Sequence, residues 1–207
     1  MLVCLRILPA CWGMPMYLDI QEKLNRIEER INRSEFMKTG GAANEIGYYV
    51  FDYDPQFELR VRAKVQDLVS RYAGRQMSFT IKEFDLFEVL LALLKEKDYL
   101  ERTFKFEEDR GFGYMQEAVT RMLRVGRDNL LVKHIKKNTP ENCVVFLTGV
   151  GKSYPFVRSH NIINSLQEVM DDTPVVLFYP GNYRDFSLSL FGTIQDGNHY
   201  RALPLIQ

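Results

Sequence analysis

The residues with the clearest chemical potential in this 207-residue chain lie in VVFLTGVGKS, residues 144–153. The stretch starts as an apolar run and ends in Gly-Lys-Ser, as a phosphate-binding loop does before its helix. A complete loop of that type has another glycine, separated by four residues from the Gly of Gly-Lys-Ser. That position holds Phe146. Because the missing glycine would permit the turn that wraps backbone N–H groups around phosphates, the sequence predicts a turn too short to enclose a polyphosphate.

A simpler anion site remains an alternative at the same place. Thr148, Gly149, Gly151 and Lys152 follow a predicted strand and precede a predicted helix, and open α/β sheets bind ligands at that edge. A single anion or a partner's carboxylate could bind there. The glycines could equally serve only a tight turn, and Pro155 favours this second interpretation because it removes a backbone N–H near the predicted helix start.

Two carboxylates, Asp52 and Asp54, also follow a predicted strand. Paired carboxylates at such an edge could bind a divalent metal or perform acid–base chemistry. Asp54 precedes Pro55, however, which is the pattern of an N-cap followed by the first helical residue. Asp52 is then simply solvated. We therefore predict no metal site here.

Histidines and cysteines add no catalytic pattern. The three histidines, at positions 134, 160 and 199, have no metal-ligand spacing, and the cysteines at 4, 11 and 143 form no Cys-x-x-Cys pair. Cys143 opens an apolar run and is expected to be a buried small hydrophobe. We predict no catalytic residue, no cofactor and a cytoplasmic location.

The chain carries 27 basic and 27 acidic residues, which argues against a protein that coats nucleic acid or anionic membranes with its whole surface. One segment, residues 120–138, is nevertheless basic. Its candidate basic patch consists of Arg121, Arg124, Arg127, Lys133, Lys136 and Lys137. Such a stripe could contact DNA phosphates, but it contains no recognition-helix motif, and a solvated face or an acidic protein partner explains it equally well.

The elements that must position these residues alternate along the chain. Apolar runs predict strands at 48–51, 78–84 and 173–181 and in CVVFLTGVG (143–151), which opens into a glycine loop, with SLSLFGTI and YRALPLI as closing strands. Apolar periodicity predicts helices at 17–36, 54–74, 85–97, 98–138 in pieces broken near Gly111–Gly113 and at Gly126, and from Pro155 onward. The pattern predicts an α/β fold: a mostly parallel sheet covered by helices on both faces, with an N-terminal amphipathic helix.

The first fifteen residues, MLVCLRILPACWGMP, differ from the rest. They are apolar but too short to span a bilayer, and they lack a clear secretory signal. Met14, near the end of this stretch, and Met16, just after it, stand before the first convincing helix. We expect residues 1–15 to be a mis-annotated or disordered start, and residues 16–207 to form a single α/β domain without membrane contact.

Longer strings are more distinctive than any short motif. FLTGVGKSYPFVRSHNIINSLQEV is followed by PVVLFYPGNY and LSLFG, and preceded by YYVFDYDP and FDLFEVLLALL. Together they resemble the BrxB family of the BREX phage-defence systems over about residues 17–206. The family positions present here are Gly149, Gly151, Pro155, Arg158, Asn161, Asn164, Pro180 and Gly181.

The resemblance implies a component of a multi-gene bacterial locus that also encodes a methyltransferase, a large ATPase and a PglZ-type phosphatase-like protein. It implies an accessory, non-catalytic part of a BREX complex that acts by protein–protein interaction, with the PglZ-type protein as the expected partner and DNA reached through the complex. It supplies no catalytic residues. The alternatives are a degenerate nucleotide- or anion-binding domain, a non-specific DNA-binding subunit and, with less support, a small-molecule enzyme.

A working surface follows from spacing. Arg158 and Asn161 lie three apart on one helical face and could clamp the glycine loop or the Tyr179-Pro180-Gly181 turn, since consecutive strands are often neighbours. The predicted rim consists of Thr148, Gly149, Gly151, Lys152, Arg158, Asn161, Tyr179 and Gly181.

Overall fold

The computed structural model describes residues 14–37, 47–74, 77–124, 126–184, 187–195 and 201–206. The segment 1–13 and the Gly-Gly pair at 40–41 lie outside these residues. The N-terminal helix α1 (Met14–Ile31) begins slightly before the predicted residue 17. The division of the chain at residue 16 stays a prediction.

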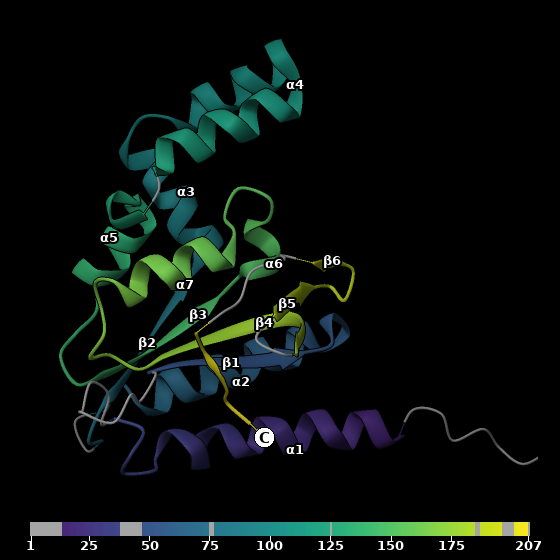
Figure 1. Cartoon of the computed structure of the whole chain (residues 1–207), viewed down its shortest axis with the longest axis vertical. Coiled ribbons are helices and arrows are strands. Elements are labelled where there is room, and N and C mark those ends of the chain that lie inside the picture. Colours follow the sequence, from purple (N-terminus) through teal and green to yellow (C-terminus); the bar gives the residue numbers. More distant parts are fainter. Residues whose placement is uncertain are drawn as a thin grey trace, which may run out of the picture.

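A mostly parallel sheet forms the centre of the molecule (Figure 1). Its strand order is β2-β3-β4-β1-β7, and each pairing along this path is parallel. The strands are β1 (Tyr48–Tyr53), β2 (Thr80–Asp85), β3 (Cys143–Thr148), β4 (Val175–Arg184) and β7 (Leu203–Pro204). The far end of β4 continues into antiparallel pairing with β5 (Ser187–Leu190), which pairs with β6 (Ile194–Gln195).

Helices cover both faces of the sheet, as predicted (Figure 1). On one face lie α1 and α2 (Glu58–Arg71), the latter preceded by the 3-10 helix η1 (Pro55–Phe57). On the other lie α3 (Leu86–Glu96), α5 (Leu130–Lys137), α6 (Val150–Ser153) and α7 (Ser159–Gln167), with α4 (Leu100–Leu123) standing farthest from the sheet and η2 (Gly126–Asp128) joining α4 to α5.

Strand residues divide alternately between two cores. In β3, Val145 and Leu147 pack with α3 to α7, whereas Val144 and Phe146 pack with α1 and α2. Successive strand side chains point to opposite faces, so a strand covered on both faces must be apolar at every position. This explains the unbroken apolar runs that identified these strands in the sequence.

Side-chain caps set several helix starts. Asp54 Oδ1 accepts a hydrogen bond from the backbone N–H of Gln56 at 3.0 Å, which confirms its predicted N-cap role. Asp85 Oδ1 accepts bonds from the N–H groups of Phe87 (3.0 Å) and Glu88 (3.3 Å) at the start of α3. These carboxylates satisfy N–H groups that have no partner within the helix.

The helix predicted to begin at Pro155 begins instead at Ser159. Residues 150–153 form the separate short helix α6, which ends at Tyr154 in an extended conformation (φ −70°, ψ 139°). Residues before proline favour this conformation for steric reasons. Pro155, after a cis peptide bond, therefore lies in the connection between α6 and α7.

Polar contacts fasten α1 to α2 above their shared apolar core. Arg71 Nη1 lies 2.5 Å from Glu28 Oε1, and Arg71 Nη2 lies 2.9 Å from Asp67 Oδ2. The hydrogen bond and charge of Arg71 lower the pKa of Glu28 and of Asp67. Because Glu28 is more acidic in the folded chain than its ordinary value of 4.5, its ionisation stabilises the packing of α1.

We expect Glu28→Gln to destabilise the protein in a pH-dependent way. A carboxyl group with a lowered folded pKa stabilises above its unfolded pKa, and that contribution disappears as the pH falls through the folded pKa. The free energy of unfolding in urea should therefore be larger for wild type than for the variant at pH 7. The two values should converge as the pH falls below about 4. Glu101→Gln, an exposed change on α4, is the control. A difference in unfolding free energy that is the same at pH 7 and below about pH 4 would contradict this role for Glu28.

Candidate functional site

The chain's own carboxylates pair with the polar side chains of the glycine loop after β3. Lys152 Nζ lies 2.5 Å from Asp85 Oδ2 and 3.9 Å from Glu88 Oε1. Thr148 Oγ1 donates a hydrogen bond to Glu83 Oε1 at 2.7 Å. The lysine and the hydroxyl that would contact a phosphate are thus bound to β2 and the start of α3.

The turn itself is as short as the sequence predicts. β3 ends at Thr148 and α6 begins at Val150, with Gly149 alone between them in the left-handed region (φ 71°). A Cβ atom on Gly149 would lie 2.1 Å from Asp85 Oδ1. Phe146, in the position of the missing loop glycine, is fully buried, and its ring centroid lies 5.0 Å from that of Phe178. The Asp85 carboxylate therefore packs tightly against the backbone of this turn.

A shallow pocket of about 260 Å³ lies beside this turn, between α2 and the ends of β2 and β3. Its charged lining residues are Glu58, Glu83, Asp85, Glu88, Arg62 and Lys152. Arg62 pairs with Glu58 at 3.0 Å, so both cations are already neutralised. Within the described part of the chain, no group of three or more His, Cys, Asp or Glu residues is arranged to hold a metal ion.

The Tyr179-Pro180-Gly181 turn lies beside the glycine loop, because β3 and β4 are neighbours as predicted. A Cβ on Gly151 would lie 3.4 Å from Pro180 Cγ, and one on Gly181 would lie 2.1 Å from the backbone oxygen of Ser189. Tyr179 is only 1% exposed. In this part of the predicted rim, small residues allow close packing, and the Tyr179 side chain belongs to the core.

Arg158 and Asn161 lie elsewhere, at the start of α7. Together with Pro155 and Phe156 they line a depression of about 520 Å³ against Gln116, Glu117, Thr120 and Arg121 of α4. Arg158 also borders a small cavity of about 30 Å³ next to Val150 and Tyr179. The structure thus places Thr148, Gly149 and Lys152 at one pocket and Arg158 and Asn161 at another, while Arg158 meets Tyr179 at the small cavity. A clamp on the glycine loop stays a prediction.

Asp52 is not the solvated residue that we expected. Its Oδ1 lies 3.2 Å from Lys23 Nζ of α1, and its Oδ2 accepts a hydrogen bond from the N–H of Tyr183 at 3.2 Å. The side chain is 29% exposed. Asp52 therefore joins α1 and β4 to the end of β1, through partners 29 and 131 positions away in the sequence.

The candidate basic patch follows the end of α4 and the length of α5. Arg121 pairs with Glu117 at 3.3 Å and Lys133 with Asp128 at 2.6 Å. Arg124, Lys136 and Lys137 are exposed, and the side chain of Arg127 lies outside the described residues. A role in DNA binding stays a prediction.

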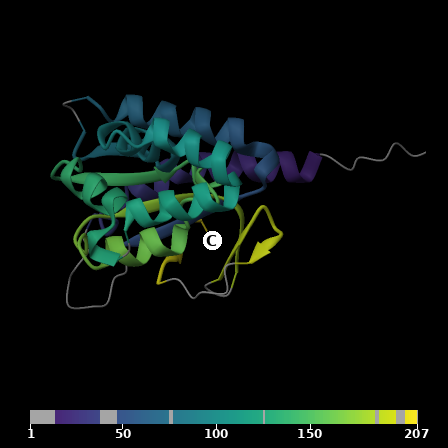
Figure 2. The same ribbon diagram turned by 90° about the horizontal axis from the view of Figure 1, so that it is seen from above.

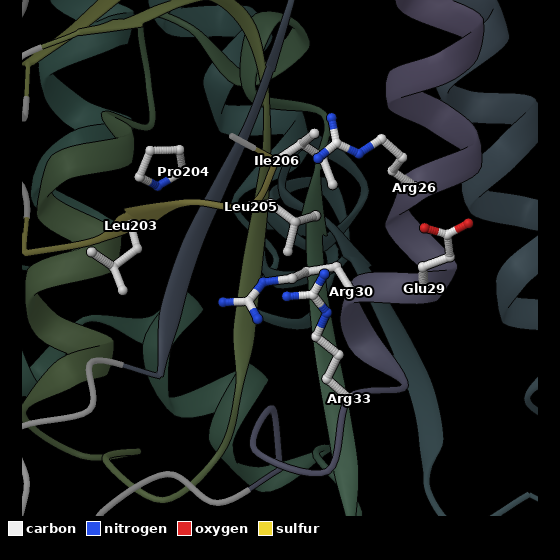
Figure 3. Close-up of a pocket in the computed structure, with 8 residues that line it drawn as sticks. All are labelled: Arg26, Glu29, Arg30, Arg33, Leu203, Pro204, Leu205 and Ile206. Carbon is white, nitrogen blue, oxygen red and sulfur yellow. The ribbon is translucent and has the colours of Figure 1, made fainter.

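Sequence reasoning missed a second cationic site, which we call the arginine groove. Its residues are Arg26, Glu29 and Arg30 of α1, Arg33 in the turn just after α1, and Leu203, Pro204, Leu205 and Ile206 at β7 (Figure 3). The spacing of the arginines, four and then three, was a visible signal of a shared helical face. Their position beside an edge strand from the other end of the chain was not.

Burial raises the pKa of several titrating side chains in and around the core. Burial raises the pKa of the Cys143 thiol, which confirms the expected buried hydrophobe. Burial also raises the pKa of Tyr48 and Tyr53, and that of Tyr183 to about 12. Within the ranges that the structure covers, every helix is too short or too polar to cross a lipid bilayer.

We predict that Gly149→Ala destabilises the protein by about 2–4 kcal/mol, because the new Cβ meets Asp85 and the left-handed conformation becomes costly. Chemical denaturation measures this loss. Gly113→Ala is the matched control, since a Cβ there has nothing within 4 Å, and it should be neutral or slightly stabilising. Equal stabilities of the two variants would contradict the close packing of Asp85 against the turn.

Comparison with known proteins places these observations in a family. The profile described as BREX protein BrxB matches residues 82–205. A BREX protein BrxB of Bacillus cereus (strain H3081.97) is 42% identical over 188 residues, covering 90% of this chain and 97% of the relative. Another, of Escherichia coli O9:H4 (strain HS), is 31% identical over 188 residues, with 90% and 92% covered. No solved structure matches. The chain therefore belongs to the BrxB family.

Proposed function

We propose that this chain is an accessory, non-catalytic component of a BREX anti-phage complex in the cytoplasm and acts by binding other BREX proteins. Membership of the BrxB family supports the place in that system. The observation that carries the non-catalytic part is the Lys152–Asp85 ion pair at 2.5 Å. Through this ion pair, the lysine of the Gly-Lys-Ser motif connects the glycine loop to the start of α3.

Electrostatics at the loop argues against a nucleotide. A polyphosphate approaching Lys152 would meet the carboxylates of Glu83, Asp85 and Glu88 in the same pocket. Like charges at such distances repel strongly in a partly desolvated site. Lys152 would also have to leave Asp85, which caps α3 at the same time.

The α4 hairpin supplies a surface suited to partners. At Gly111 (φ 81°, ψ 171°) the chain reverses, so that residues 100–110 and 112–123 lie side by side, away from the sheet (Figures 1 and 2). Phe104 is 56% and Phe112 47% exposed on this hairpin. Exposed aromatic side chains on a projecting element are typical of protein interfaces. We infer that the PglZ-type protein is the direct partner and binds here.

Co-purification tests this proposal. A tagged chain expressed with its BREX locus should retain the PglZ-type protein, and Phe104→Ser/Phe112→Ser should reduce that retention at least tenfold, since buried aromatic anchors dominate interface energy. Leu59→Ser is the matched control, because Leu59 is 75% exposed on α2, on the other face of the sheet. Loss of all BREX proteins from the wild-type sample would refute the function. Full retention by the double variant would refute only the hairpin.

Calorimetry tests the competing nucleotide-binding hypothesis. We expect no saturable heat with ATP or GTP at micromolar concentrations, with or without magnesium, and the same result for Lys152→Ala. Saturable binding that the Lys152→Ala variant lacks would show that the lysine exchanges Asp85 for phosphate and would favour nucleotide binding.

A further inference from the structure

The arginine groove lies on the face of the sheet opposite the α4 hairpin, between α1 and the edge strand β7 (Figures 1 and 3). It encloses about 260 Å³. The arginines form one wall, Arg26 and Arg30 on α1 and Arg33 just after it, and residues 203–206 form the other wall, around β7. The groove therefore has one cationic side and one largely apolar side.

The cationic wall carries an excess of positive charge. Three guanidinium groups, of Arg26, Arg30 and Arg33, line it together with the carboxylate of Glu29, and Arg30 Nη1 lies 3.9 Å from Oε1 of the exposed Glu35. Across the ranges that the structure covers, Arg26 and Arg33 have no ion-pair partner, and both are exposed. Unpaired guanidinium groups gathered in a concave site favour an anionic ligand.

Arg30 is held in place by aromatic rings. Its guanidinium carbon lies 5.6 Å from the ring centroid of Tyr49 and 5.9 Å from that of Phe36. The two rings are stacked on each other at 4.6 Å. A guanidinium fixed in this way loses less conformational entropy when it binds a planar carboxylate with two hydrogen bonds.

The opposite wall limits how a partner can bind. The N–H of Leu205 donates to the oxygen of Val50 at 2.8 Å, so Leu203 and Leu205 direct their backbone groups toward β1, and Pro204 directs its own outward. Proline has no N–H to donate, which disfavours extension of the sheet by a further strand. We therefore infer that a partner binds here mainly through its side chains.

An extended peptide with alternating side chains fits these two walls. Odd and even side chains of an extended peptide point in opposite directions, and neighbours on the same side are about 7 Å apart. This spacing is close to the rise of roughly 6 Å between Arg26 and Arg30 along α1. Acidic side chains would meet the arginines while apolar ones pack on residues 203–206. A DNA backbone presents no aliphatic side chains that could pack on that second wall, and this difference favours a peptide.

We propose that the arginine groove binds an acidic, extended segment of a protein partner, with carboxylates paired to Arg26, Arg30 and Arg33 and apolar side chains against residues 203–206. The inference rests on the proposed function only in that the segment belongs to another protein of the complex. It names a surface distinct from the α4 hairpin.

Fluorescence anisotropy with the full chain tests the groove. The probe is a short labelled peptide of alternating Glu and Leu, compared with Gln–Leu and Glu–Ser versions. Wild type should bind the Glu–Leu peptide at least tenfold more tightly than either, and Arg26→Gln/Arg33→Gln should weaken binding by about tenfold per arginine. Arg26→Lys/Arg33→Lys should give an intermediate affinity, because an ammonium group lacks the planar fork.

Arg121→Gln/Lys137→Gln is the matched control, since it removes the same charge from the candidate basic patch and should leave peptide binding unchanged. Thermal unfolding verifies that each variant is folded. Absence of peptide binding, or equal binding by Arg26→Gln/Arg33→Gln, overturns the proposal. If binding of a DNA duplex is lost in Arg26→Gln/Arg33→Gln while binding of the peptide is unchanged, the proposal is overturned in favour of nucleic acid.

Co-purification separates this proposal from the proposed function. If wild type retains BREX proteins and Arg26→Gln/Arg33→Gln loses one of them, the acidic segment belongs to the protein lost. If wild type and variant retain the same proteins equally, the groove is not a docking site in the complex. If wild type retains none, the proposed function fails, and the peptide titration alone decides whether the groove binds acidic segments.

Discussion

The carboxylate of Asp85 joins three parts of the chain at the edge of the sheet. One oxygen caps α3, the other pairs with Lys152, and the group packs closely against Gly149, whose backbone is in the left-handed region. Each contact depends on the others, since the cap fixes the carboxylate, and the carboxylate fixes the lysine. This arrangement makes the Gly-Lys-Ser sequence a structural feature, and the interpretation of the whole edge depends on it.

Polar and small residues make similar structural contacts at the ends of other strands. Asp52, which sequence reasoning offered as a metal ligand or a solvated residue, binds Lys23 and the N–H of Tyr183. Gly181 lets β5 approach closely, and Gly151 faces Pro180 and the ring of Phe191. Polar and small residues at the carboxyl ends of the strands thus hold elements together.

Sequence patterns predicted the elements better than they predicted the partners of side chains. Unbroken apolar strands revealed a sheet covered on both faces, because burial on both sides demands apolar residues at every position. The Asp54-Pro55 pair revealed an N-cap because capping is a local interaction. The helix start predicted at Pro155 was wrong, because a proline is compatible both with a first helical turn and with a bend between two helices. Lys152 with Asp85, and Asp52 with Tyr183, join residues far apart in the chain, and no local pattern records such contacts.

The arginine groove shows why placement matters as much as composition. Arg26, Arg30 and Arg33 are visible in the sequence as a helical stripe, yet α1 carries other charges and the stripe alone predicts only solvation. The chain around β7 places residues 203–206 beside this stripe, and together they form a concave site. The α4 hairpin projects from the other face of the sheet (Figure 1). Because the sheet separates the two surfaces, a partner bound at one leaves the other accessible, and this geometry suits a component that connects two members of an assembly.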